Sequence, residues 1–149
     1  MTLETSYAAK VSSGDPGQQP LHLVSILVVE DNDDSRELLE YLLSRAGARV
    51  RVAMDGVEAL ELLDHDIPHI IVSDLSMPRL DGFGLLQRLT SLRRELPPVP
   101  AIAISAMTSP EDRRRAIEVG FRAHLPKPVD SDQLIQTIQS LLRDAVTAA

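Results

Sequence analysis

Residues 70–78, IIVSDLSMP, decide which fold the sequence adopts. The first three residues are β-branched and apolar, and such a continuous run is typical of a strand that is buried on both faces of a parallel sheet. The run ends in one carboxylate, Asp74, and Pro78 soon prevents the strand from continuing regularly. The stretch therefore predicts a central parallel strand over 70–73 that carries an acidic side chain at its carboxyl end.

The rest of the chain alternates between short apolar runs and longer segments with helical periodicity. We expect further strands over about 26–29, 49–52, 99–105 and 121–125, and helices over about 33–46, 55–64, 82–94, 110–119 and 130–145. Strands that alternate with helices predict an α/β fold in which helices cover both faces of a parallel sheet. Because crossovers between parallel strands are right-handed, the five-stranded parallel sheet must be doubly wound.

The order of the strands follows from their hydrophobic patterns. Residues 49–52, RVRV, alternate between polar and apolar side chains, as expected for a half-exposed strand at the edge of the sheet. The first, third and fourth strands are continuous apolar runs, so they belong in the middle. The order 2-1-3-4-5 satisfies both conditions and places the reversal of winding between strands one and three.

The composition limits the location and the partners of the protein. A net charge of −7 disfavours nucleic acid or an anionic membrane as the main partner. The sequence has no cysteine, which excludes disulfides and thiolate chemistry and fits a reducing cytosol. No apolar run approaches the ~20 residues that a membrane-spanning helix needs. These features predict a soluble, cytoplasmic protein without membrane insertion.

The beginning of the chain differs in texture from the rest. Residues 1–23 contain several Ser, Gly and Pro residues and no sustained apolar period, so we expect a flexible N-terminal tail. A single domain over 24–146 and a short C-terminal end at 147–149 complete the expected organisation.

Polar side chains follow four of the predicted strands at their carboxyl ends. The first strand is followed by Glu30 and Asp31, the third by Asp74, the fourth ends in Ser105, and the fifth leads to Lys127. Ligands of open parallel sheets bind at this edge, where the winding reverses. Three carboxylates brought together would repel one another unless a cation joined them, and Mg²⁺ accepts such oxygen ligands. The sequence therefore predicts a magnesium site at this edge.

The same residues favour phosphoryl chemistry. The ammonium of Lys127 is placed to neutralise phosphoryl oxygens, and the hydroxyl of Ser105 is a donor for them. An aspartate can act as nucleophile and form an acyl phosphate, and Asp74 is the best candidate because it stands alone and central. The plainer alternatives are that Asp31 only caps the following helix and that Asp74 is a solvated turn residue. No glycine-rich phosphate cradle of P-loop type occurs in the sequence.

Four motifs together resemble the receiver domain of two-component response regulators. They are ILVVEDN at 26–32, IIVSDLSMPRLDG at 70–82, AIAISA at 101–106 and HLPKPVD at 124–130. The resemblance covers about residues 24–146 and includes the chemotaxis regulators, which have a flavodoxin-like (βα)5 fold with the strand order given above. The last motif is similar to receivers that are attached to hybrid histidine kinases.

The resemblance implies a role for each matching residue of the acidic edge. Asp74 would accept a phosphoryl group from a phosphohistidine of a kinase. Glu30 and Asp31 would hold Mg²⁺ together with Asp74, and the backbone carbonyl of Ser76 would be a further ligand of the ion. Lys127 matches the lysine that contacts the phosphoryl group.

Five more positions match residues that flank or read the site in this family. Ser105 corresponds to the switch hydroxyl, Ala106 to a small residue that leaves access to the phosphate, and Met107 flanks the site. Pro128 would follow Lys127 across a cis peptide bond. The family usually has Tyr or Phe where this chain has His124, so the resemblance leaves two alternatives for His124, a switch residue or an exposed strand residue.

The family implies a phosphoacceptor and not a turnover enzyme. Its phosphodonor would be a sensor or hybrid histidine kinase, or a histidine phosphotransfer protein. Output would pass to a downstream protein through the surface of the fourth helix, fifth strand and fifth helix, and a homodimer is an open alternative. We expect a stand-alone receiver, with a phosphorelay shuttle or a piece of a hybrid kinase as alternatives.

Two rival functions differ in class. The pattern Asp31-Asn32-Asp33 satisfies the D-x-D motif of haloacid-dehalogenase-like phosphatases, in which Asp31 would be the nucleophile. The following loop lacks the glycine and threonine of that family, and this reading leaves Asp74 unexplained. The other rival is a pseudo-receiver that only binds a partner, which the complete set of site residues argues against.

Overall fold

Five strands alternate with five helices in the part of the chain that the computed structural model describes, residues 19–92 and 99–148. The elements are β1 (Ser25–Val29), α2 (Asp33–Arg45), β2 (Arg49–Ala53), α3 (Gly56–His65), β3 (Ile70–Asp74), α4 (Gly82–Leu92), β4 (Ala101–Ser105), α5 (Pro110–Val119), β5 (Ala123–Pro126) and α6 (Ser131–Ala148). Residues 93–98 lie outside the described residues. They include the expected end of the helix over 82–94 and the loop before the fourth strand.

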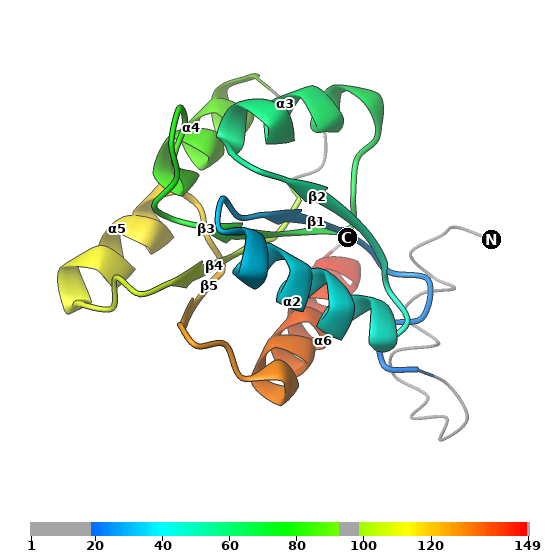
Figure 1. Ribbon diagram of the computed structural model, residues 1–149. Helices are drawn as coiled ribbons and strands as arrows, with labels where there is room; N and C mark the ends of the chain where they lie inside the picture. Colours follow the sequence, from blue (N-terminus) through cyan, green and yellow to red (C-terminus); the bar gives the residue numbers. More distant parts are fainter. Residues whose placement is uncertain (1–18, 93–98, 149) are drawn as a thin grey trace.

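The strands form one parallel sheet in the order β2-β1-β3-β4-β5. Helices α2 and α6 cover one face, and α3, α4 and α5 cover the other (Figure 1). The predicted doubly wound α/β fold and its strand order are therefore confirmed. As expected from its alternating sequence, β2 lies at an edge of the sheet.

Two hydrophobic clusters hold the helices against the sheet. Along β1, Ile26 and Val28 belong to the cluster beneath α2 and α6, whereas Leu27 and Val29 belong to the cluster beneath α3, α4 and α5. Successive side chains of a strand point to opposite faces, so a continuous apolar run supplies both clusters. This explains why the central strands read as unbroken apolar segments.

Several boundaries differ from those expected from the sequence. The fifth strand begins at Ala123 and not at Phe121, because the amide of Phe121 donates to the carbonyl of Ala116 and so completes the turn that ends α5. Gly120 adopts a φ of 122° in that turn, a conformation that favours glycine. The last helix continues to Ala148, so the expected C-terminal end at 147–149 is helical at least to that residue.

The folded part of the chain begins before residue 24, where the domain was expected to start. Residues 1–18 lie outside the described residues, but Leu21 is fully buried in the cluster beneath α2 and α6. The amide of Leu21 donates to the carbonyl of Ala46, and the side-chain amide of Gln139 donates to the carbonyl of Pro20. The boundary at residue 23 is therefore too late, because a single buried leucine gives no periodic pattern in the sequence.

Replacing Leu21 by alanine tests this packing. We expect the free energy of unfolding to fall by about 2 kcal/mol, because the substitution removes buried methyl groups and leaves a cavity. Leu23→Ala is the matched control. Because Leu23 is 40% exposed, this substitution should lower the free energy of unfolding far less. Urea denaturation of both variants measures the difference, and equal stabilities would contradict the structural role of Leu21.

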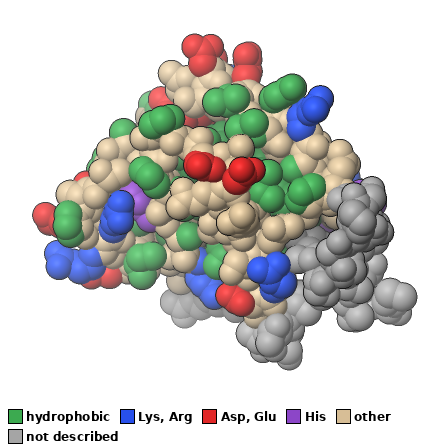
Figure 2. All heavy atoms as spheres, turned by 90° about the horizontal axis from the view of Figure 1, so that it is seen from below, with side chains coloured by type: hydrophobic (Ala, Val, Ile, Leu, Met, Phe, Trp, Pro, Cys, Tyr) green, Lys and Arg blue, Asp and Glu red, His purple; other side chains and the backbone are tan. Residues whose placement is uncertain are grey.

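The surface carries large hydrophobic side chains on separate elements. Leu38 and Tyr41 are exposed on α2, Ile117 on α5 and Met54 after β2. On the face shown in Figure 2, hydrophobic side chains are interspersed with acidic and basic ones. Among the described residues, the helices are all too short or too polar to cross a membrane.

Candidate functional site

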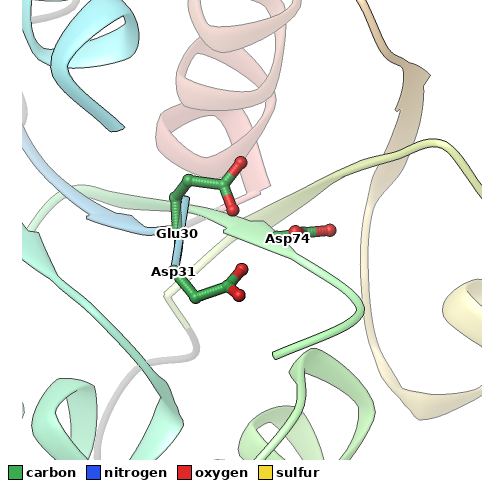
Figure 3. A group of neighbouring side chains, drawn as sticks. All are labelled: Glu30, Asp31 and Asp74. Carbon is green, nitrogen blue, oxygen red and sulfur yellow. The ribbon is translucent and has the colours of Figure 1, made fainter. Parts of the chain in front are cut away.

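The register of the sheet brings the ends of the central strands to one level. Val29 pairs with Ser73, so Glu30 and Asp31 continue from β1 beside Asp74 at the end of β3. Figure 3 shows the side chains of Glu30, Asp31 and Asp74 beside one another at the ends of these two strands.

Three carboxylates form the centre of the site. One oxygen from each of Glu30, Asp31 and Asp74 lies within 4.8 Å of the other two. Glu30 and Asp74 are buried, whereas Asp31 is exposed. Carboxylates this close repel one another in a partly buried position, so the arrangement favours a bound cation or a neighbouring positive charge.

Lys127 supplies a positive charge to this cluster. Its Nζ lies 2.5 Å from Oε1 of Glu30 and 3.2 Å from Oδ2 of Asp74. Its backbone amide donates to the carbonyl of Ser105, which fixes the start of the loop after β5 beside the end of β4. The ammonium is therefore held between two carboxylates that come from two different strands.

Burial and charge shift the protonation of this cluster. Burial is the largest influence on Glu30 and raises its pKa, the hydrogen bond from Lys127 lowers it and the neighbouring Asp74 raises it, so that the resulting pKa of Glu30 is about 7. Burial lowers the pKa of Lys127, but its hydrogen bond to Glu30 and the charge of Asp74 outweigh this effect and leave that pKa above its ordinary value. Lys127 thus stays charged, while Glu30 exchanges its proton near neutral pH.

The two serines of the predicted site occupy different positions. The amide of Ser76 donates to Oδ1 of Asp74 at 3.3 Å, so the chain turns back over the carboxylate immediately after β3. The hydroxyl of Ser105 is buried and accepts a hydrogen bond of 2.9 Å from the amide of Met107. The hydrogen of this hydroxyl remains available to a second acceptor.

His124 contacts the loop that follows Ser105. Its Nε2 lies 3.0 Å from the carbonyl oxygen of Met107, while its Nδ1 is buried and has no hydrogen-bond partner among the described residues. Because the carbonyl is an acceptor, Nε2 is the nitrogen that carries the hydrogen in this contact. His124 is therefore not a freely exposed strand residue. Ala106 beside this loop is exposed, and the Lys127–Pro128 peptide bond is cis.

Sequence reasoning missed Arg36 and Gly82, which contact the backbone of the site. The guanidinium of Arg36 donates to the carbonyl of Glu30 at 3.1 Å and forms an ion pair of 2.6 Å with Asp33. A Cβ added to Gly82 would overlap the carbonyl oxygen of Asp74, so only glycine fits there. The sequence gives a signal for Gly82 only as the start of a helix, and none for the contact of Arg36.

The donor set fits a magnesium ion. Glu30, Asp31 and Asp74 offer hard carboxylate oxygens from two strands, and the exposed position of Asp31 leaves one side of the cluster open to water. Mg²⁺ binds in proteins to a few carboxylates while it keeps several waters.

The comparison with protein families shows to which family the chain belongs. The model of the response regulator receiver domain matches residues 26–139, which include the acidic cluster, Ser105 and Lys127. The chain belongs to the response regulator receiver family. This confirms the resemblance inferred from the four motifs, and an α/β fold of this topology is what the solved receiver structures share.

The receiver domain has similar relatives of two sizes. An uncharacterized 14.6 kDa protein of Leptolyngbya boryana is 45% identical over 124 residues, which are 81% of this chain and 92% of that protein. The response regulator MprA of Mycobacterium ulcerans is 39% identical over 120 residues, which are 80% of this chain and 50% of MprA. The chain thus spans about half the length of the MprA relatives that it matches.

Two solved receiver domains resemble the structure closely. The receiver domain of the Francisella response regulator 1452 is 30% identical, with a TM-score of 0.75 over 81% of this chain and 98% of that one. The receiver domain of the sensor histidine kinase PA1611 from Pseudomonas aeruginosa, solved with a magnesium ion in its active-site cleft, is 28% identical. Its TM-score is 0.73, over 80% of this chain and 98% of that one.

Proposed function

We propose that this receiver domain accepts a phosphoryl group on Asp74 from a phosphohistidine and thereby switches its contacts with a partner protein. One observation carries the proposal: the carboxylate of Asp74 lies at the end of a central strand, 3.2 Å from the ammonium of Lys127 and within 4.8 Å of the carboxylates of Glu30 and Asp31. The proposal assigns to Asp74 the role of nucleophile, to Lys127 that of the phosphate-binding cation, and to the three carboxylates that of metal ligands.

In the proposed transfer, a carboxylate oxygen of Asp74 forms a bond to phosphorus as the phosphorus–nitrogen bond of the phosphohistidine breaks. The leaving imidazole nitrogen keeps the electron pair, and Asp74 becomes an acyl phosphate. Lys127 neutralises charge on the phosphoryl oxygens, and the hydroxyl of Ser105 donates to one of them. The chain undergoes one transfer for each donor and in this sense is a phosphoacceptor rather than a turnover enzyme.

Glu30, Asp31 and Asp74 would hold Mg²⁺ with their side chains, and Ser76 would contribute its backbone carbonyl. When bound, the ion supplies positive charge that stabilises the phosphoryl oxygens during transfer. The magnesium ion in the PA1611 receiver supports this assignment.

The switch is proposed to run through Met107. Its amide binds the hydroxyl of Ser105, and its carbonyl oxygen contacts the ring of His124. A movement of Ser105 toward the phosphoryl group would therefore shift Met107 and alter the contact that keeps His124 inward. His124 lies on β5, so the surface formed by α5, β5 and α6 is the proposed output surface.

The partners follow from the family. Receiver domains pair with histidine kinases, so a sensor or hybrid kinase, or a histidine phosphotransfer protein, is the proposed donor. The proposed downstream partner is a protein. This agrees with the net charge of −7, which disfavours nucleic acid as a partner. A homodimer and a cytoplasmic location stay predictions.

A labelling experiment tests the function against its two rivals. The protein is incubated with acetyl phosphate and Mg²⁺, and the modified residue is identified by borohydride trapping and peptide mass spectrometry. Label on Asp74 supports the receiver function, label on Asp31 supports the phosphatase, and no label with a competent donor supports a binding module.

Magnesium affinity should depend on pH through Glu30. Mg²⁺ binds the carboxylate and not the carboxylic acid, and the pKa of Glu30 is raised to about 7. We therefore expect the apparent affinity to rise roughly fivefold to tenfold between about pH 6 and about pH 8. Without metal, stability should fall as pH rises from 4.5 to about 7, because the unfolded chain loses the Glu30 proton first.

Isothermal titration of Mg²⁺ at several pH values measures this dependence. Glu30→Gln should bind Mg²⁺ more weakly and lose most of the pH dependence. Glu37→Gln is the control for the lost charge, because Glu37 is exposed on α2, and it should keep the pH dependence of the natural chain. An unchanged pH profile in Glu30→Gln would contradict the prediction.

A further inference from the structure

Arg79 has an unusual backbone conformation close to the proposed phosphorylation site. It lies in the acceptor loop, residues 75–81, which connects Asp74 to α4. Its φ is 65°, a value that residues other than glycine rarely adopt, and the amide of Leu80 donates to the carbonyl of Pro78 across it at 2.7 Å. A disfavoured conformation of this kind persists only where surrounding contacts hold it.

The side chain of Arg79 makes such a contact with the beginning of α3. Its Nε donates to Oδ2 of Asp55 at 2.8 Å, and its Nη2 donates to Oδ1 at 3.1 Å, so the guanidinium grips both carboxylate oxygens. The side chain of Asp55 is only 10% exposed, although that of Arg79 is 60% exposed. The hydrogen bond from Arg79 lowers the pKa of Asp55, which keeps this carboxylate charged.

Asp55 also forms a hydrogen bond to the backbone of α3. Its Oδ1 accepts a hydrogen bond of 2.9 Å from the amide of Glu58 and so caps α3. Arg79 is therefore connected through Asp55 to the beginning of α3. This differs from a simple surface pair such as Arg114 and Glu118, whose closest atoms are 3.9 Å apart and whose side chains are both exposed.

A backbone contact strengthens the same connection. The amide of Gly56 donates to the carbonyl of Leu80 at 3.0 Å, and a Cβ on Gly56 would lie only 2.6 Å from that oxygen. At the far end of the loop, the amide of Gly82 donates to the carbonyl of Leu75 at 3.0 Å. The acceptor loop is thus hydrogen-bonded to the start of α3 through Leu80, and the hydrogen bond between Gly82 and Leu75 joins the two ends of the loop.

We propose that Asp55 and Arg79 are positioning residues that hold the acceptor loop in the conformation needed for magnesium binding and phosphoryl transfer. The inference rests on the proposed function, since the loop matters because it begins at Asp74 and contains the Ser76 carbonyl. Neither residue contacts the reacting atoms. Their role is to keep the backbone after Asp74 in place while Mg²⁺ and the phosphoryl group bind.

Two substitutions separate positioning from stability. Arg79→Gly removes the guanidinium, which costs the ion pair, but glycine accepts the positive φ without strain; because these effects oppose each other, the global free energy of unfolding should change little. Asp55→Asn keeps an oxygen that caps α3 but removes the charge that binds Arg79. Arg114→Ala is the control, because it removes an arginine from an exposed ion pair on α5.

Three measurements on the full chain test the proposal. In the metal-free protein, the amides of Gly56 and Gly82 should exchange hydrogen roughly threefold to tenfold faster in Arg79→Gly than in the natural chain. The apparent dissociation constant for Mg²⁺ should rise, and the rate of phosphorylation by acetyl phosphate should fall, by a similar factor. The double variant with Asp55→Asn should be no worse than either single variant, because both remove one contact.

The outcomes distinguish this inference from the proposed function. If the natural chain is labelled on Asp74 but Arg79→Gly matches it in exchange, magnesium affinity and rate, the positioning role is overturned and the function stands. If the natural chain takes no phosphoryl group, the proposed function fails, while faster exchange and weaker Mg²⁺ binding in Arg79→Gly would still support the loop contact. Equal losses in Arg114→Ala would show a general charge effect and would overturn the proposal.

Discussion

The Asp74→Asn variant should take up no phosphoryl group at all. The amide of asparagine is neutral and a far weaker nucleophile than a carboxylate, so the acyl phosphate cannot form. The variant should still fold, because asparagine has the same shape and its side-chain oxygen accepts the hydrogen bond from the amide of Ser76. The substitution removes the ion pair with Lys127 but also relieves the repulsion among three neighbouring carboxylates, so we expect the free energy of unfolding to change little.

Intact-mass spectrometry after incubation with acetyl phosphate and Mg²⁺ measures this effect. Asp31→Asn is the matched control, since it removes a carboxylate from the same cluster but not the proposed acceptor. It should bind Mg²⁺ more weakly and still become labelled on Asp74 when Mg²⁺ is raised. Full labelling of Asp74→Asn would refute the assignment of the acceptor.

The Gly82→Ala variant should lose both stability and phosphorylation. The added Cβ would overlap the carbonyl oxygen of Asp74 and lie 3.0 Å from Cα of Leu75, and both are backbone atoms that no side-chain rotation can move away. Either α4 or the end of β3 must shift, which we expect to lower the free energy of unfolding by about 3 kcal/mol or more. A shift at the end of β3 would displace Asp74 relative to Lys127 and the other carboxylates.

Gly84→Ala provides a close comparison two residues further along α4. The only atom closer than 3.4 Å to its Cβ would be Cδ1 of the flexible Leu80 side chain, at 2.6 Å, while Oδ1 of Asp81 at 3.4 Å would be in ordinary van der Waals contact. Alanine also favours the helix more than glycine does. Gly84→Ala should therefore change the unfolding midpoint little and keep most of the phosphorylation rate. Urea denaturation and labelling of both variants measure the contrast, and similar behaviour of the two would contradict the steric argument.

The sequence predicted the fold because the signals for it are local. Helix and strand periods, the glycines and caps at helix ends, and the alternating pattern of β2 can all be read within short windows. The expected limits of the fifth strand were wrong because Phe121 belongs to the turn that ends α5, a hydrogen-bonding choice that hydrophobicity does not report. The expected end of the tail was wrong because Leu21 is a single apolar residue without a period.

Part of the candidate site could likewise be predicted from the sequence, and part of it could not. The strand order alone indicated that acidic side chains from two strands would meet at one edge, and the matching motifs named the residues. The additional contacts of Arg36, Gly82 and the pair formed by Asp55 and Arg79 had no such signal, because each depends on how loops lie against one another after folding.

By itself, then, the sequence determined a doubly wound parallel sheet and the identity of the polar side chains at the carboxyl ends of its strands. Only the tertiary structure decided how those side chains interact: Lys127 reaches Glu30 across 97 residues, and Arg79 reaches Asp55 across 24. It also decided that burial raises the pKa of Glu30 and that His124 turns toward Met107. The physical reason is that periodicity is set by neighbours along the chain, whereas distance, burial and charge depend on register and loop packing.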